Sequence, residues 1–168
     1  MNRRIGIPTM FKGVLLRSRT EARWAAFFDA LGWPWEYEPI DLNGYIPDFI
    51  LSFDAGKLLV EVKSTEDDFE LAKAKIEASG WDHEAIVVAS GATPELGRFL
   101  EQDAQTFAWG DARVFFCLSC GEPSIHCESG SWRCRKCGAD HGNAHVGHQD
   151  TSALWIEAGN RVQWRPAA

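Results

Sequence analysis

The sequence predicts an α/β protein, with a mixed sheet flanked by helices. Two observations carry this prediction: segments with helical periodicity alternate with short β-branched segments along the first two thirds of the chain, and 45% of the 168 residues are hydrophobic against 24% charged, as in a packed globular domain. A third observation concerns the end of the chain, where all five cysteines lie between Cys117 and Cys137. We therefore predict an α/β domain over residues 1–116 and a small cysteine-stapled module over residues 117–168.

The first predicted helix runs from Ser18 to Leu31. Ser18 and Glu21 have the spacing of a capping box, and Gly32 and Pro34 end the helix. Its apolar stripe, at positions i, i+3, i+4 and i+7, consists of Trp24, Phe27, Phe28 and Leu31.

Two strands follow a short extended piece at residues 35–37. The segments 45–53 and 57–63 are separated by a turn at residues 54–56, which predicts a hairpin. A helix then begins with acidic residues at 66–68 and ends before Gly80, so its charges complement its dipole. The β-branched run at 85–89 predicts a buried strand at the centre of the sheet.

The later elements complete the prediction. Thr93 and Pro94 predict the start of a helix that runs to about Ala104, and residues 113–116 predict the last strand of the core. Residues 151–164 read as two terminal strands around a turn at 158–160.

The charge distribution excludes a polycation that coats nucleic acid, because 17 basic and 24 acidic residues give a net charge of −7. Any phosphate must therefore be met locally, and a basic arm before Glu21 is the better candidate, although a solvated charged terminus explains it as well. The arm consists of Arg3, Arg4, Lys12, Arg17 and Arg19. The sequence shows no membrane span and no signal peptide, so we expect a soluble, cytoplasmic protein without a membrane partner.

Acidic and basic side chains meet at the predicted hairpin. Glu61 and Lys63 point to the same face of their strand, and Asp48 near the start of the preceding strand should lie close to Glu61. Two carboxylates with a further oxygen ligand suit Mg²⁺. The alternative makes Asp48 a turn residue and the other two a solvated strand face.

Glu21 extends the apolar stripe of the first helix backwards. A carboxylate on a buried face needs a partner. It is either a second ligand of the metal site or fully used by the capping box with Ser18, and the sequence leaves both open.

These residues resemble a known motif. Pro47-Asp48, twelve intervening residues and Glu61-Val62-Lys63, preceded by a helix that carries Glu21, resemble the PD-(D/E)XK nuclease superfamily over about residues 17 to 90. The stretch from Ser18 to Gly32, followed by Pro47-Asp48-Phe49 and Glu61-Val62-Lys63-Ser64, is especially similar to phage and mobile-element members, which include junction resolvases, transposon-end nucleases and restriction-like endonucleases. The resemblance implies a restriction-endonuclease-like αβββαβ core.

The resemblance also implies a function and a mechanism. Asp48 and Glu61 would hold Mg²⁺ or Mn²⁺, Lys63 would orient or help deprotonate the attacking water, and Glu21 would complete the metal shell of a DNA endonuclease. The competing hypothesis is a catalytically silent nuclease-fold subunit that binds DNA or a partner enzyme. Whether the substrate is branched, single-stranded or duplex DNA, and whether the chain forms a homodimer, stays open.

The cysteine module has the spacing of a zinc ribbon. Two Cys-x2-Cys pairs, each followed by glycine, are separated by thirteen residues and predict one structural Zn²⁺. Its ligands are Cys117, Cys120, Cys134 and Cys137, which leaves Cys127 as a free thiol. Nearby histidines can replace a thiolate or be loop residues: His126, His141, His145 and His148.

The second cysteine pair also carries aromatic and basic residues, namely Trp132, Arg133, Arg135 and Lys136. If these side chains share one surface, they suit phosphate contact and base stacking. Protein docking is the alternative role for such a ribbon.

Overall fold

The computed structural model describes residues 6–90, 96–102, 107–128, 131–142 and 149–163. In chain order, its elements are β1 (Thr9–Phe11), β2 (Val14–Leu16), α1 (Arg19–Ala30), β3 (Trp35–Tyr37), β4 (Phe49–Phe53), β5 (Gly56–Val62), a 3₁₀ turn η1 (Glu66–Asp68), α2 (Phe69–Ala78), β6 (Ala85–Val88), β7 (Gly97–Gln102), β8 (Phe107–Phe116), β9 (Pro123–Cys127) and α3 (Ser152–Arg161).

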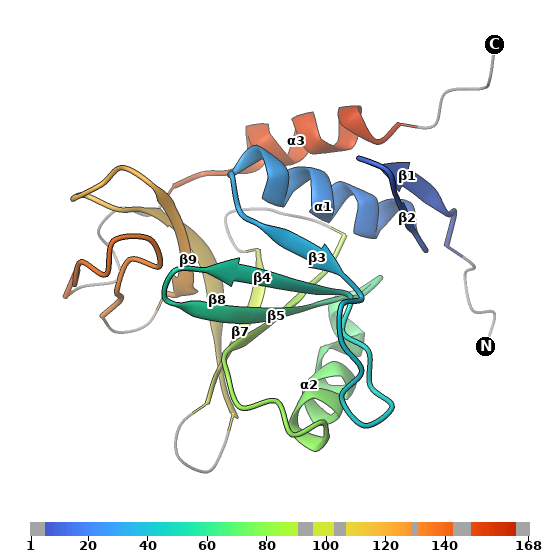
Figure 1. Cartoon of the computed structure of the whole chain (residues 1–168), viewed down its shortest axis with the longest axis horizontal. Helices are drawn as coiled ribbons and strands as arrows, with labels where there is room; N and C mark the ends of the chain where they lie inside the picture. The colour runs from blue at the N-terminus through green and yellow to red at the C-terminus, as the bar shows by residue number, and fades with distance from the viewer. Residues whose placement is uncertain (1–5, 91–95, 103–106, 129–130, 143–148, 164–168) are drawn as a thin grey trace.

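Strands β3 to β9 form a seven-stranded sheet in which each strand pairs with its neighbour in the sequence (Figure 1). Every pairing is antiparallel except that of β5 with β6, which run parallel because α2 connects them. The predicted mixed α/β sheet with flanking helices is confirmed at this level.

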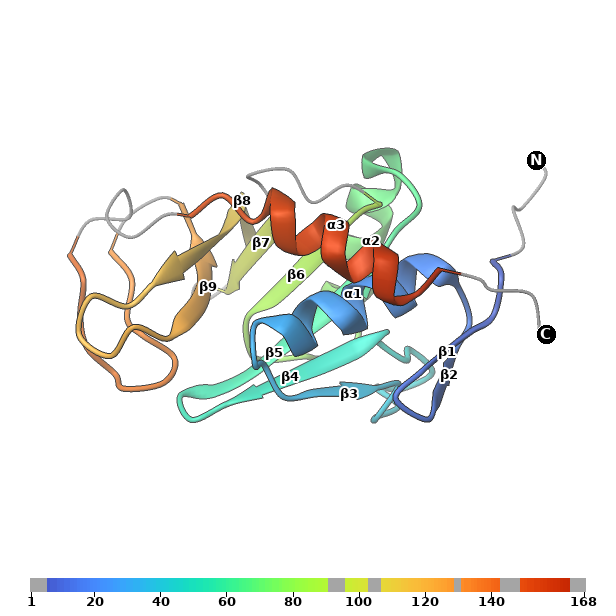
Figure 2. The ribbon, with the colours of Figure 1, turned by 90° about the horizontal axis from the view of Figure 1, so that it is seen from above.

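Helices cover both faces of the sheet. Helices α1 and α3 lie side by side on one face, where their apolar side chains pack with Phe49, Val60 and Val88 (Figure 2). Helix α2 covers the other face and packs with the oppositely directed Leu59 and Val87. The strands at the centre of the sheet are therefore buried on both sides, as their continuous apolar sequences require.

Helix α1 begins as the sequence predicts. The hydroxyl oxygen of Ser18 accepts a hydrogen bond from the amide of Glu21 at 3.1 Å, and Gly32 adopts a left-handed conformation with φ of 69° just after the helix. Trp24, Phe27 and Phe28 are fully buried. Burial of three such rings supplies the driving force that holds α1 on the sheet.

The hairpin of β4 and β5 brings the predicted site together. Its register pairs Phe49 with Val60, and Gly56 forms part of the tight turn with φ of 132°. Asp48, one residue before β4, therefore lies beside the C-terminal end of β5, as predicted.

The helix predicted from Thr93 to about Ala104 is wrong over its described part, where β7 crosses the sheet. A Cβ atom on Gly97 would lie 2.2 Å from the carbonyl oxygen of Val87, so this glycine permits the close approach of β7 to β6. Residues 91–95 and 103–106, which include the predicted helix start at Thr93 and Pro94, lie outside the described residues.

The predicted terminal hairpin is also wrong, because residues 152–161 form α3. Trp155, Ala158 and Val162 are buried against α1 with helical spacing. Strand β9 pairs with β8, so the boundary predicted near Cys117 falls between two strands of one sheet.

The N-terminal segment forms a small hairpin, β1 with β2, that the sequence did not predict. No helix within the described ranges is sufficiently long and apolar to cross a membrane.

Candidate active site and cysteine cluster

A cleft of about 840 Å³ opens at the C-terminal end of β5. We call it the acidic cleft. Its polar lining comes from the start of α1 and the chain before it, the loop before β4, the end of β5, η1 and the C-terminal end of α2: Arg17, Glu21, Asn43, Tyr45, Asp48, Glu61, Lys63, Ser64, Asp68, Lys75 and Ser79. The four predicted site residues, Glu21, Asp48, Glu61 and Lys63, all line it.

Asp48 is held from two sides and is only 6% exposed. Its Oδ2 accepts a hydrogen bond from the backbone N–H of Val62 at 2.7 Å, and its Oδ1 accepts one from Nη2 of Arg17 at 3.1 Å. Burial, followed by the charge of Glu61, raises the pKa of Asp48 to about 7. Burial is therefore the main reason that Asp48 resists ionisation, and the neighbouring carboxylate of Glu61 adds to it.

Glu61, on β5, lies beside Asp48 and is buried to the same extent. Its Oε1 forms an ion pair with the ammonium group of Lys63, which shares its face of the strand, as predicted. Its Oε2 accepts a hydrogen bond from the hydroxyl of Tyr45 at 2.7 Å.

Tyr45 is a site residue that the sequence did not reveal. Burial, then the charge and hydrogen bond of Glu61, raise the pKa of its phenol well above the ordinary range, so Tyr45 stays protonated and donates. Tyr45 also exchanges backbone hydrogen bonds with Leu42, which fixes the loop before β4. No local sequence pattern points to this role of Tyr45, because its contact with Glu61 depends on how a loop of irregular backbone folds over β5.

Glu21 lines the cleft, but protein donors occupy both of its oxygens. Oε1 accepts from the hydroxyl of Ser18 at 2.7 Å, while Oε2 accepts from Tyr37 at 2.6 Å and from the amide of Arg17 at 3.1 Å. Glu21, Asp48 and Glu61 do not bring three ligand atoms within 4.8 Å of one another; among the described residues only the cysteines form such a group.

Two of the three described members of the predicted basic arm form ion pairs with protein carboxylates. Arg17 pairs with Glu38 at 2.5 Å and with Asp48, and Lys12 pairs with Asp29. Arg3 and Arg4 lie outside the described residues.

The acidic cleft can hold a divalent cation through Asp48 and Glu61. Each oxygen of Asp48 and Glu61 accepts only one protein hydrogen bond and keeps a second lone pair, whereas Oε2 of Glu21 accepts two. Two hard oxygen ligands, with water and phosphate oxygens completing the shell, are the usual environment of Mg²⁺. A bound cation would offset the charge of Glu61, which is the second cause of the raised pKa of Asp48 after burial.

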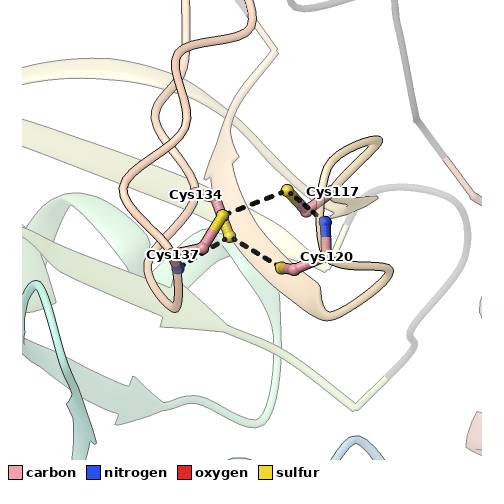
Figure 3. Close-up of side chains that lie close together, drawn as sticks. All are labelled: Cys117, Cys120, Cys134 and Cys137. Carbon is pink, nitrogen blue, oxygen red and sulfur yellow. Dashed lines mark hydrogen bonds between the residues drawn. The ribbon is translucent and has the colours of Figure 1, made fainter.

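The four predicted cysteine ligands converge at one point beyond the edge of the sheet (Figure 3). The Sγ atoms of Cys117 and Cys137 lie 3.6 Å apart, and those of Cys120 and Cys134 lie 3.7 Å apart. A tetrahedral zinc with Zn–S bonds of about 2.3 Å requires sulfur atoms separated by about 3.8 Å. The cluster is thus compatible with a structural zinc ion.

The two Cys-x2-Cys turns have matching geometry. Backbone amides of Ser119 and Cys120 donate to Sγ of Cys117 at 3.4 and 3.5 Å, and those of Lys136 and Cys137 donate to Sγ of Cys134 at the same distances. These donors favour thiolates. Burial opposes ionisation of Cys117, but the amide of Cys120 and the imidazole of His141 outweigh it and lower its pKa to about 5.

The remaining cysteine and histidines take different places. Cys127 is buried in the main core at the end of β9, and His141 contacts Cys117 with its Nε2 at 3.1 Å. Burial, then the charge of Arg135, lower the pKa of His126 to about 3. His145 and His148 lie outside the described residues.

The expected aromatic and basic surface on the second cysteine turn is not formed. Trp132 and Arg135 are buried, and only Arg133 and Lys136 face solvent. Arg135 instead donates to Glu84 at 2.6 Å and to the carbonyl of Ile125 at 2.8 Å. The turn is therefore anchored to the sheet.

Comparison of the chain with protein-family models, with curated proteins and with solved structures gives no match. The function is therefore argued from the geometry of the chain itself.

Proposed function

We propose that the protein is a divalent-metal-dependent DNA nuclease whose active site is the acidic cleft. The observation that carries this proposal is the pair of buried carboxylates, Asp48 and Glu61, beside the ammonium group of Lys63. Burial of two adjacent carboxylates is costly for the fold alone, since it raises the pKa of Asp48 to about 7. A functional role accounts for this costly arrangement better than a contribution to stability does.

The three residues have separate roles. Asp48 and Glu61 provide the oxygen ligands, and Mg²⁺ or Mn²⁺ bound to them would polarise a phosphodiester and acidify a water. Lys63, two residues after Glu61 on the same face, places its ammonium group beside the carboxylate of Glu61. There it would orient the attacking water and stabilise the negative charge that develops on it. Tyr45, through its hydrogen bond to Glu61, fixes the rotamer of that carboxylate.

Glu21 acts by positioning rather than as a metal ligand. Its carboxylate connects Ser18, Arg17 and Tyr37, and Arg17 in turn holds Oδ1 of Asp48. The hydroxyl of Tyr37 accepts from the side chain of Arg17 at 3.3 Å, which closes the network. Glu21 thus aligns the guanidinium group that orients the metal-binding carboxylate.

The cysteine cluster has a structural role in this proposal. The four thiolates close a tetrahedral zinc site without an open position for substrate. The Arg135 anchor lies by the turn before β5, since the carbonyl of Arg135 accepts from the amide of Ala55 at 3.1 Å. Five residues of β5, about 17 Å of strand, separate that turn from Glu61. In this proposal, zinc stabilises the end of the sheet near the β4–β5 turn and takes no part in phosphodiester hydrolysis.

The test is a cleavage assay on supercoiled, linear, single-stranded and four-way-junction DNA with and without Mg²⁺. Wild type should cleave at least one of these substrates, and this cleavage should require Mg²⁺. Asp48→Asn and Glu61→Gln should lower the rate by orders of magnitude while the fold persists. Glu36→Gln, on exposed β3 outside the cleft, is the matched control. Lys63→Ala should slow cleavage without weakening metal binding. Lys57→Ala, at the other end of β5, should change neither the cleavage rate nor metal binding.

The panel also tests the competing proposal of a silent accessory subunit. If wild type binds DNA but cleaves no substrate with Mg²⁺ or Mn²⁺, the chain binds nucleic acid without hydrolysing it and the nuclease proposal is overturned.

A further inference from the structure

A second hollow of about 610 Å³ lies between α1, α3 and the end of β6. We call it the arginine hollow. Its polar groups are all basic or neutral: Arg19, Thr20, Arg23, Ser90, Asn160 and Gln163. Among the described residues, no aspartate or glutamate lines it. A hollow with guanidinium, hydroxyl and amide groups but no carboxylate is suited to an anion.

Arg23 is built into the wall of this hollow. Its Nε and Nη2 donate to the carbonyl oxygen of Trp155 at 3.0 and 2.7 Å, and its Cζ lies 4.0 Å from the centre of the Trp155 ring. Gly159 is necessary for this arrangement, since a Cβ there would lie 2.9 Å from Nε of Arg23. The guanidinium plane is therefore fixed before any ligand binds.

Two positive charges, those of Arg19 and Arg23, meet in the hollow, and no carboxylate of the described residues lines it or forms an ion pair with either. Burial, then the charge of Arg19, lower the pKa of Arg23. Neither Arg19 nor Nη1 of Arg23 has a hydrogen-bond acceptor within the described part of the chain, in contrast to Lys12 and Arg17 of the same arm. Arg19 is thus the described member of the basic arm that is free to meet a phosphate.

The arginine hollow adjoins the acidic cleft. The start of α1 separates them: Arg17 and Glu21 line the cleft, while Arg19 and Arg23 line the hollow. The two also meet where the hydroxyl of Ser90, in the hollow, donates to the carbonyl of Ser64, in the cleft, at 3.4 Å. A chain of phosphates that enters one can continue into the other.

We infer that the arginine hollow binds a backbone phosphate of the DNA strand, next to the phosphodiester that lies in the acidic cleft. This inference rests on the proposed nuclease function and adds the subsite that holds the substrate. The chain has a net charge of −7, and its cleft is lined by carboxylates, so a separate cationic contact is necessary to draw a polyanion to it. Arginine suits this contact because its planar fork matches phosphate oxygens.

The experiment measures binding of a short labelled DNA duplex to the full chain by fluorescence anisotropy, with Ca²⁺ in place of Mg²⁺, over a series of salt concentrations. The variants are Arg19→Gln and Arg19→Glu. Lys57→Gln is the matched control, because Lys57 is exposed at the far end of β5. Arg23 is left intact, since it also holds α3.

Arg19→Gln should weaken binding by about 3- to 10-fold at low salt and reduce the slope of log K against log salt by about one, with a larger effect for Arg19→Glu. Lys57→Gln should change neither. The inference is overturned if Arg19→Gln retains wild-type affinity and slope, or if Lys57→Gln loses as much. If Arg19→Gln binds like wild type while wild type still cleaves DNA with Mg²⁺, the phosphate subsite is wrong but the proposed nuclease function stands. Failure of the subsite is therefore distinguishable from failure of the proposed function.

Discussion

Asp48 should make the metal-free protein less stable as pH rises, and the variant Asp48→Asn should remove this effect. Burial beside Glu61 raises the pKa of Asp48 from an ordinary 3.8 to about 7 in the folded protein. Between these two values, the folded chain holds a proton that the unfolded chain has lost. The free energy of unfolding therefore falls as pH rises from about 4 to about 7.

The size of the effect follows from the shift. A change of about three pH units, at about 1.4 kcal/mol each, amounts to about 4 kcal/mol as an upper limit. The limit is meaningful here because Asp48 is only 6% exposed. Asparagine keeps the shape and an oxygen that can accept from the amide of Val62, but it has no charge to desolvate.

The assay is urea unfolding of wild type and Asp48→Asn at pH 5 and pH 8. The buffers contain no Mg²⁺ and no chelator, since a chelator would remove ions from the cysteine cluster as well. The variant should lose less stability than wild type between the two pH values, by up to about 3 kcal/mol, because about two of the three pH units of the shift lie above pH 5. Mg²⁺ added at pH 8 should then stabilise wild type and not the variant.

Equal pH dependence in the two proteins would refute this reasoning, because it would show that Asp48 titrates normally. Glu36→Gln serves as the control for loss of an exposed carboxylate, and it should track wild type at both pH values. Stabilisation of Asp48→Asn by Mg²⁺ to the same extent as wild type would show that the cation binds elsewhere.

Three further predictions follow from other parts of the molecule. Elemental analysis should find about one zinc per chain, and Cys134→Ser should lower both this stoichiometry and the melting temperature, whereas Cys127→Ser should keep the zinc; a wild-type stoichiometry near zero would contradict the zinc assignment. Arg135→Lys should cost about 1 to 3 kcal/mol in chemical unfolding, because one ammonium cannot span Ile125 and Glu84, while Arg133→Lys on the exposed side should be neutral; equal effects would remove the anchoring role. Glu21→Gln should lower the cleavage rate with little change in the Mg²⁺ concentration at half-maximal rate, while a large rise in that concentration would show that Glu21 is a metal ligand after all.

The sequence predicted the parts of the fold and site that depend on local rules. Helix α1 was predictable because its cap and apolar stripe both occur within one segment. The meeting of Asp48 with Glu61 was predictable because a short hairpin turn fixes the register of β4 on β5. Side-chain alternation along one strand was enough to put Lys63 beside Glu61.

The misses are positions where tertiary contacts override local patterns. Gly159 and Asn160 were interpreted as a turn, but both lie in α3, where the side chain of Arg23 occupies the space that a Cβ on Gly159 would fill. Gly97 falls within the segment predicted as a helix and is in fact the point where β7 approaches the backbone of β6. Such close approaches have no local sequence signal.

The site contains the same kind of long-range feature. Arg17 was one of the candidate phosphate contacts in the basic arm, yet it holds Asp48, 31 residues away in the sequence. Arg135 was placed on an exposed surface and is buried against Glu84, at a separation of 51 residues. Only packing of the sheet shows which charges are satisfied by protein and which, as at Arg19, are left for a ligand.

The most direct test of the central claim is the single-turnover rate of DNA cleavage as a function of Mg²⁺ concentration, in wild type and Glu61→Gln. The account predicts a rate that rises to saturation with Mg²⁺ in wild type and in Glu36→Gln, and that falls by orders of magnitude in Glu61→Gln at every concentration. Equal rates in wild type and Glu61→Gln, or cleavage by wild type that does not depend on a divalent metal, would contradict it.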